Sequence, residues 1–147
     1  MTKDITRTYN SFRLFLLGKK IRDAFRLEVE KNDVSIGHAM IINVLNGYGS
    51  LSQVQMSRIL NITPASVSNL IQSMLKDQLI ERKADEKDER IMLATLSEKG
   101  LAQSKIVKEA WKSVEQRFTG AFTNEENQLI SQLLNKFEEK EYLLNES

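Results

Sequence analysis

The sequence has no cysteine and a single histidine, His38, among its 147 residues. The missing cysteines exclude disulfides, thiolate metal sites and sensing by thiol oxidation. One imidazole does not build a metal site, so we expect neither a metal nor a cofactor. No apolar run approaches the length that spans a bilayer, and no signal-peptide pattern is present, so a cytoplasmic protein is the expectation.

The sequence also lacks an excess of either charge, because 21 basic and 20 acidic side chains give a net charge of +1. Residues 50–100 hold seven of each sign. Net charge alone therefore does not indicate a DNA-binding protein, although acidic residues that lie elsewhere still leave room for a basic surface. The sequence has no phosphate-binding glycine loop, nucleophile–base set or suitably spaced carboxylate pair, so we predict that it is not an enzyme and has no catalytic residues.

Two short helices with a tight turn between them are the most informative feature. They are predicted at Ser52–Leu60 and Pro64–Gln78. The first begins with a Ser–Gln capping box, and Thr63 precedes the second as an N-cap, with proline at the first helical position. Residues 79–96 are then typical of a strand, a charged loop and a strand. This order predicts a winged helix-turn-helix, which can place its second helix in a DNA major groove.

The second helix has an apolar face and a polar face. The apolar residues recur at helical spacing and are expected to face a core. They are Val67, Leu70, Ile71, Met74 and Leu75. The polar face is nearly neutral, so it can approach base edges without desolvating a carboxylate, whereas an ordinary solvated face is the alternative. Asn and Gln pair bidentately with adenine, and Ser bonds to bases or phosphates. The predicted DNA contacts are Thr63, Ala65, Ser66, Ser68, Asn69, Gln72 and Lys76.

The charged loop between the strands spans residues 84–90. A solvated hairpin tip is one interpretation, since charge runs usually are solvated. In the other, Arg90 enters a narrow minor groove and Asp88 holds its guanidinium in a bidentate pair. Basic side chains of the incoming strand then meet phosphates. The predicted wing contacts are Arg82, Lys83, Lys87, Asp88 and Arg90.

Long helical patterns flank the winged motif on both sides. Residues before Ser35 carry two apolar stripes, one of Ile5, Tyr9, Phe12 and Leu16 and one of Leu14, Leu17, Ile21 and Phe25. Ser35 fits the cap of a helix that runs to about Asn46, with a loop from there to Ser50. Because these flanks carry more apolar surface than one small lobe can hide, we predict a two-fold dimer. A monomer with a self-contained helical core is the alternative.

Beyond the hairpin, Ser97 fits the N-cap of a long helix whose pattern breaks at Thr119-Gly120. Thr123 and Glu126 fit a second capping box, which begins the last helix. We predict a mainly α protein with a small β-hairpin wing. Its predicted parts are an N-terminal dimerisation helix in residues 1–34, a winged helix-turn-helix lobe in residues 35–100, and C-terminal helices in residues 101–147 that complete the dimer interface.

Residues 51–100 resemble the winged-helix core of the MarR family of bacterial transcriptional regulators. The resemblance lies in the ordered motifs T-P-A-S-V, L-I-E-R, D-x-x-D-x-R and L-S-E-K-G. The resemblance implies a homodimer that binds an operator, usually as a repressor. It also implies that a small molecule, commonly aromatic or acidic, often releases the protein from DNA. By position, it assigns base reading to Ser66, Ser68, Asn69 and Gln72, the minor-groove arginine to Arg90 and the orienting acid to Asp88.

Asn69 departs from the family pattern, because many members carry arginine there. We therefore expect near-palindromic, A·T-rich half-sites bound by a homodimeric DNA-binding regulator. The alternative is a winged-helix module that binds protein rather than DNA, an interpretation that the neutral charge of residues 50–100 supports. Candidate effector-pocket residues are Tyr9, Arg13, His38 and Trp111, each of which also has a purely structural interpretation in the core, at an interface or in an ion pair.

Overall fold

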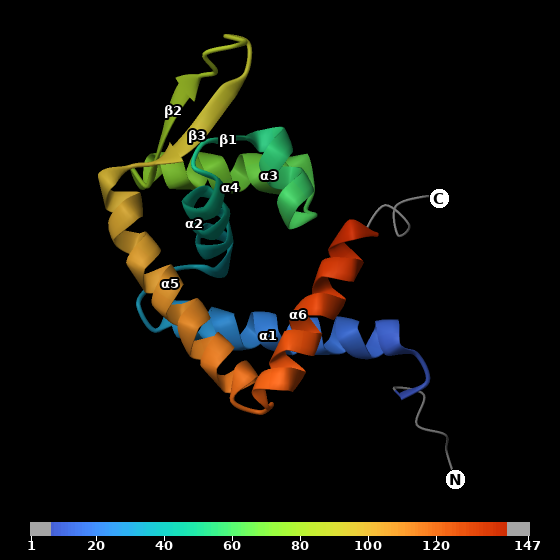
Figure 1. Cartoon of the computed structure of the whole chain (residues 1–147). Coiled ribbons are helices and arrows are strands. Elements are labelled where there is room, and N and C mark those ends of the chain that lie inside the picture. The colour runs from blue at the N-terminus through green and yellow to red at the C-terminus, as the bar shows by residue number, and fades with distance from the viewer. Residues whose placement is uncertain (1–6, 141–147) are drawn as a thin grey trace. The chain divides into compact units, whose positions relative to one another are not determined.

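A computed structural model describes residues 7–140 of the chain (Figure 1). The fold is mainly helical with one small antiparallel sheet, as the sequence predicts. The elements are α1 (Asn10–Glu30), α2 (Ile36–Tyr48), β1 (Leu51–Ser52), α3 (Gln53–Leu60), α4 (Pro64–Lys76), β2 (Ile80–Ala84), β3 (Met92–Leu96), α5 (Glu98–Thr119) and α6 (Asn124–Glu139). The chain divides into two compact units, residues 1–112 and 113–147, which are described separately. Among residues 7–140, no helix has the length and apolar character needed to cross a bilayer.

The helix α1 is buried only near its C-terminal end. Phe25 and Val29 are fully buried, whereas most of the large apolar side chains of the first half are exposed. Those exposed residues include Phe12, Leu14, Phe15 and Leu17. The predicted stripes are therefore present on a helix, but most of their surface is uncovered within one chain. Ile5, the first member of one stripe, lies outside the described residues.

The helix α2 begins where predicted and ends later. The hydroxyl of Ser35 accepts a hydrogen bond from the backbone N–H of His38 at 3.3 Å, which is an N-cap. The predicted loop is wrong at Asn46-Gly47, because the helix continues to Tyr48, and correct at Gly49-Ser50. It ends at Gly49, whose φ of 84° leaves the helical region and whose N–H donates to the Leu45 carbonyl at 2.8 Å.

The caps of the helix-turn-helix are formed as the sequence predicts. The backbone N–H of Gln55 donates to Ser52 Oγ at 3.2 Å, and the Ser52 N–H donates to Gln55 Oε1 at 2.9 Å. At the start of α4, the N–H of Ser66 donates to Thr63 Oγ1 at 3.1 Å. These bonds satisfy N–H groups that a helix start leaves without partners, so they fix where α3 and α4 begin.

The second helix of the motif, α4, is two residues shorter than predicted. It ends at Lys76, because Gln78 adopts a left-handed conformation with φ 60° and the N–H of Leu79 turns back to the Met74 carbonyl at 2.9 Å. This arrangement is a Schellman-type C-terminus, which usually carries glycine at the left-handed position. Because glutamine is not a usual residue at this position, the sequence placed the end of the helix two residues too late.

The sheet has three strands in the order β1-β3-β2, one more than the predicted hairpin. Leu51 pairs with Ala94 on one side of β3, and Arg82 pairs with Ala94 on the other. A two-residue strand offers no alternating pattern, so β1 left no signal in the sequence. Its pairing attaches the start of α3 to the base of the wing.

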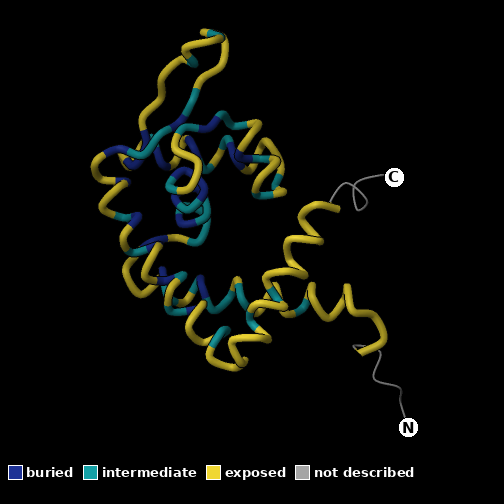
Figure 2. The backbone as a smooth tube through the Cα atoms, viewed as in Figure 1, coloured by how far each residue is buried: buried dark blue, intermediate teal, exposed yellow. Residues whose placement is uncertain are grey.

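The core of residues 1–112 gathers around α2, α4 and the inner face of the sheet, whereas the wing tip is exposed (Figure 2). Val67, Ile71 and Met74 of α4 are fully buried. Leu70 and Leu75, expected to face the core, are only half-buried because they lie at the edges of the apolar face. Both flank the polar face that remains in solvent.

Residues 113–147 form the second unit, described as far as residue 140. The predicted break at Thr119-Gly120 is confirmed, and the capping box of α6 has Thr123 and Glu126 in the expected reciprocal bonds at 3.2 and 3.0 Å. Phe118 and Phe122 meet edge to face, with ring centroids 5.5 Å apart. No residue of α6 is buried, and most of its apolar stripe is exposed. That stripe includes Leu129, Leu133, Leu134 and Phe137.

Candidate nucleic-acid interface

The polar face of α4 presents most of the predicted base-reading side chains to solvent. Thr63, Ala65, Ser66, Asn69, Gln72 and Lys76 are exposed. Ser68 is the exception, because it is half-buried beside the core residue Val67. At the start of the helix, the Thr63 hydroxyl donates to Ser66 Oγ at 2.8 Å, so the Ser66 hydroxyl keeps its own proton for another acceptor.

Ser73 lies on the same face but is attached to α2. Its hydroxyl hydrogen-bonds His38 Nε2 at 2.9 Å. From the sequence, His38 was predicted only as a candidate effector-pocket residue. Its contact with Ser73 links two segments 35 residues apart, and no local pattern indicates it.

The wing holds its arginine as the sequence predicts. Arg90 donates from Nε to Asp88 Oδ1 and from Nη2 to Asp88 Oδ2, both at 3.0 Å, which is a bidentate pair. The backbone N–H of Arg90 also donates to Asp88 Oδ1 at 3.1 Å. The Arg90 side chain is 90% exposed, so the pair orients a guanidinium that nothing else in the described chain covers.

The same contacts stabilise both charges of the pair. The Arg90 side-chain hydrogen bond, with its backbone hydrogen bond second, lowers the pKa of Asp88 below its usual value. Asp88 in turn raises the pKa of Arg90. The carboxylate therefore stays ionised wherever an ordinary aspartate does, and one of the acidic residues in the loop is neutralised by its neighbour.

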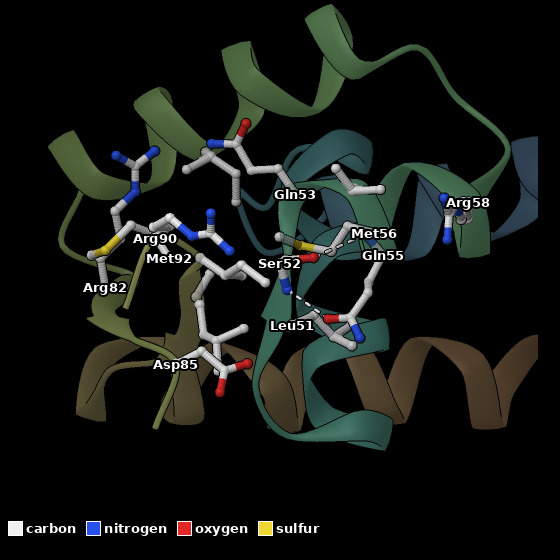
Figure 3. Close-up of a pocket in the computed structure, with 15 residues that line it drawn as sticks. Leu51, Ser52, Gln53, Gln55, Met56, Arg58, Arg82, Asp85, Arg90 and Met92 are labelled. Atoms are coloured by element: carbon white, nitrogen blue, oxygen red, sulfur yellow. Dashed lines mark hydrogen bonds between the residues drawn. The ribbon is translucent and has the colours of Figure 1, made fainter. Parts of the chain in front are cut away.

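A groove of about 670 Å³ lies between the start of α3 and the wing (Figure 3). Arg82, Arg90 and Met92 lie together on its wing side, and Arg58 lies on its α3 side. Lys83 does not line it, because successive strand residues point to opposite faces of the sheet. Arg58, an exposed cation in the last turn of α3, was not predicted, because a single basic residue there forms no recognisable motif.

The four candidate effector-pocket residues are not gathered in one cavity of this chain. Tyr9 just before α1 and Arg13 in α1 are both exposed. The His38 side chain is hydrogen-bonded to the Ser73 hydroxyl. Trp111 stacks on Phe25, with ring centroids 4.1 Å apart, and its buried Nε1 has no partner among the described residues. The stacking shows Trp111 packed at an interhelical contact, which was the structural alternative for this residue. As an effector pocket, the set stays a prediction.

Comparison with known proteins finds one matching family model and several solved structures of similar fold. The family model of the MarR family matches residues 32–91, from just after α1 to the end of the wing loop. No curated protein matches the chain. Among solved structures, a mutant of MarR from E. coli complexed with operator DNA superposes with a TM-score of 0.76 at 15% identity, covering 92% of this chain and 98% of that chain.

Two further structures have the same fold. The S. aureus MepR–DNA complex gives a TM-score of 0.77 at 20% identity, over 91% of this chain and 99% of that one. Bordetella bronchiseptica BpsR, whose DNA binding is regulated by 6-hydroxynicotinic acid, gives 0.77 at 19% identity over 94% and 98%. The MarR family model thus matches the winged helix-turn-helix part of this chain, residues 32–91, and the solved structures share its fold.

Proposed function

We propose that the protein is a homodimeric, sequence-specific DNA-binding regulator that represses transcription until a small molecule releases it. The observation that carries this proposal is the pairing of an exposed, nearly neutral recognition face on α4 with a wing arginine held in place by Asp88. An amide-rich helix face suits base edges, and an oriented, exposed guanidinium suits a minor groove.

The DNA complexes of related folds support the proposal. The E. coli MarR mutant was solved with operator DNA and S. aureus MepR with DNA, and both chains share the arrangement of helices and wing described above. In this protein the bases are read by Ser66, Asn69 and Gln72, with Ser68 contributing less because it is half-buried. The operator is near-palindromic because a two-fold dimer reads two half-sites. It is A·T-rich because amide side chains favour adenine.

The basic side chains supply the phosphate contacts. Arg82 and Arg58 line the groove beside Arg90, while Lys83 and Lys87 lie elsewhere on the wing and Lys76 lies near the end of α4. Such contacts fix the register of the protein on the duplex without reading sequence. Their loss is expected to lower affinity for all DNA sequences alike.

Dimerisation covers the apolar faces that one chain leaves in solvent. Phe15 is 56% exposed on α1, and Phe137 is 56% exposed on α6. Each belongs to a contiguous apolar stripe on its helix, and faces of this kind mark protein interaction sites. A two-fold axis then places two α4 helices about 34 Å apart, one turn of DNA. The predicted parts of the chain, residues 1–34, 35–100 and 101–147, belong to this proposal.

Release by a small molecule follows the behaviour of a related fold, since 6-hydroxynicotinic acid regulates DNA binding by BpsR. The effector class proposed here is a small aromatic or acidic molecule. Tyr9, Arg13, His38 and Trp111 remain the candidate contacts, to be completed by the second protomer. Trp111 brings an indole N–H that is buried and has no partner among the described residues.

Selection from a randomised duplex library, followed by gel shift across salt concentrations, tests the proposal. We expect an A·T-rich inverted repeat, bound by one dimer, whose affinity falls steeply with salt because phosphate contacts release counterions. Failure to enrich any sequence at low salt would refute DNA recognition. In that case the alternative, a winged-helix module that binds protein, would become the better interpretation.

A further inference from the structure

The turn that ends the recognition helix is held by the first residues of α5. Three successive carbonyls of this turn each accept one hydrogen bond from that segment. Lys99 Nζ donates to the Asp77 carbonyl at 2.8 Å, and Ser97 Oγ donates to the Gln78 carbonyl at 2.6 Å. The backbone N–H of Ser97 donates to the Leu79 carbonyl at 3.0 Å. Carbonyls that the end of a helix leaves without partners are thus satisfied by another helix.

Gly100 makes this contact unusually close. A Cβ at this position would collide with the Leu79 carbonyl oxygen. Its own N–H donates to Ser97 Oγ at 3.0 Å. The Ser97 hydroxyl therefore has two roles, because it caps α5 and donates to the end of α4. We call Ser97, Lys99 and Gly100, together with the three carbonyls, the α4–α5 joint.

The joint connects two parts of residues 1–112. On one side, the N–H of Leu79 is bonded to the Met74 carbonyl, so the turn belongs to α4. On the other side, α5 is a continuous helix as far as Trp111, which stacks on Phe25 of α1 with an interplanar angle of 16°. The exposed apolar half of α1 lies on the same helix as Phe25. A chain of direct contacts therefore runs from α1 through α5 to the recognition helix.

We infer that Ser97, Lys99 and Gly100 are positioning residues that set the angle of α4 relative to α1 and the first part of α5, and thereby the spacing between half-sites that the dimer accepts. This inference rests on the proposed function. None of the three belongs to the polar face of α4 that is proposed to read bases. Ser97 and Gly100 are buried, and the Lys99 amine donates a hydrogen bond to the Asp77 carbonyl. They are therefore expected to change which spacing is preferred, without changing which bases are preferred.

Gly100→Ala is the first test, with Gly47→Ala as its matched control. Both glycines are helical, but a Cβ at Gly47 meets nothing within 4 Å. We measure operator affinity on a series of duplexes whose half-sites are moved by one base pair, about 3.4 Å, in either direction. For Gly100→Ala we expect about tenfold weaker binding at the wild-type spacing and a shift of the optimum by one base pair, with base preference unchanged. Gly47→Ala should keep the wild-type optimum.

A measurement on the free protein separates this inference from the proposed function. Because the chain has no cysteine, Gln72→Cys gives one spin-label site on each recognition helix. Combined with Gly100→Ala, it should show a shifted or broadened distance between the two labels, and combined with Gly47→Ala it should not. Failure of every duplex to bind the wild-type protein would refute the proposed function, and the distance measurement would still decide on the joint. If the labelled protein gives no measurable distance between two spin labels, the dimer and the inference are both refuted.

Milder substitutions keep the test valid if Gly100→Ala does not fold. Lys99→Met removes one exposed hydrogen bond, and we expect a smaller change of the same kind. Ser97→Ala removes two bonds and should broaden the spacing preference, whereas Ser97→Thr keeps the hydroxyl and should restore it. Thr123→Ala removes the N-cap of α6 and should lower stability alone. Unchanged spacing preference and label distance in folded Lys99→Met and Ser97→Ala would overturn the inference.

Discussion

Removing the wing arginine should weaken operator binding strongly while leaving the fold intact. Arg90 is 90% exposed, and the side-chain contact recorded for it is the pair with Asp88, so Arg90→Ala removes no core packing. Exposed ion pairs contribute little to stability, and the thermal midpoint should therefore stay close to that of the wild type. Loss of one good groove contact corresponds to roughly a tenfold to hundredfold increase in Kd.

The aspartate of the pair provides a graded comparison. Asp88→Asn keeps an oxygen that can accept the backbone N–H of Arg90 but loses the charge and the bidentate geometry. We expect a smaller loss, because the arginine remains present but is less well oriented. Lys87→Ala, at the same loop, serves as a control for general loss of positive charge. Gel shift at moderate salt measures all three variants, and operator affinity of Arg90→Ala equal to that of the wild type would refute the role of the wing.

The pair should not make binding sensitive to pH near neutrality. Arg90 lowers the pKa of Asp88 below its ordinary value. A carboxyl whose pKa is lowered by folding stays ionised above its unfolded value, and its contribution is lost only as the pH falls through the lowered one. The affinity ratio between wild type and Asp88→Asn should therefore be constant from about pH 6 to pH 8. A ratio that declines within that range would contradict the assigned cause of the pKa shift.

Three further predictions concern readout, assembly and stability. Asn69→Ala or Gln72→Ala should relax one symmetric pair of base positions at roughly 1–3 kcal/mol per contact, whereas Lys76→Ala should weaken all sequences equally, and randomised-site selection distinguishes the two outcomes. Phe15→Ser should raise the dimer dissociation constant about tenfold or more in sedimentation, since a two-fold interface carries the change twice, and an unchanged constant would exclude this face of α1. Gln78→Gly should raise the free energy of unfolding by about 1 kcal/mol in denaturant titration, because glycine adopts the observed φ of 60° without strain; destabilisation would show that the glutamine side chain contributes more than its exposure suggests.

The parts of the fold that the sequence predicted are those with local signals. Both capping boxes, the caps at Ser35 and Thr63 and the Asp88–Arg90 pair involve residues two or three positions apart. Each can be found by scanning along the chain, because the donor, the acceptor and the spacing are fixed by helix or loop geometry. The start of every helix that follows such a cap was accordingly placed within one residue.

The features that the sequence did not predict depend on contacts between distant segments. The strand β1 exists because Leu51 meets Ala94, and the His38–Ser73 bond joins residues 35 positions apart. The end of α4 was placed too late because Gln78 stands where the left-handed conformation usually indicates glycine. The α4–α5 joint follows the same rule, since nothing around Gly100 in the sequence indicates which carbonyl it approaches. The DNA contacts of the recognition face and wing stay predictions.

The balanced charge of residues 50–100 makes the proposed dimer necessary for tight binding. Seven basic and seven acidic side chains leave one lobe little net attraction to phosphates, which supply most of non-specific affinity. Two lobes held at a fixed spacing make the second contact intramolecular, which can raise overall affinity by about 10²–10⁴ without any new side chain. Affinity then depends on the apolar face of α1 and on the α4–α5 joint as much as on the bases read. Phe15→Ser should accordingly cost more operator affinity than the loss of any single base contact, while its binding to an isolated half-site stays at the wild-type level.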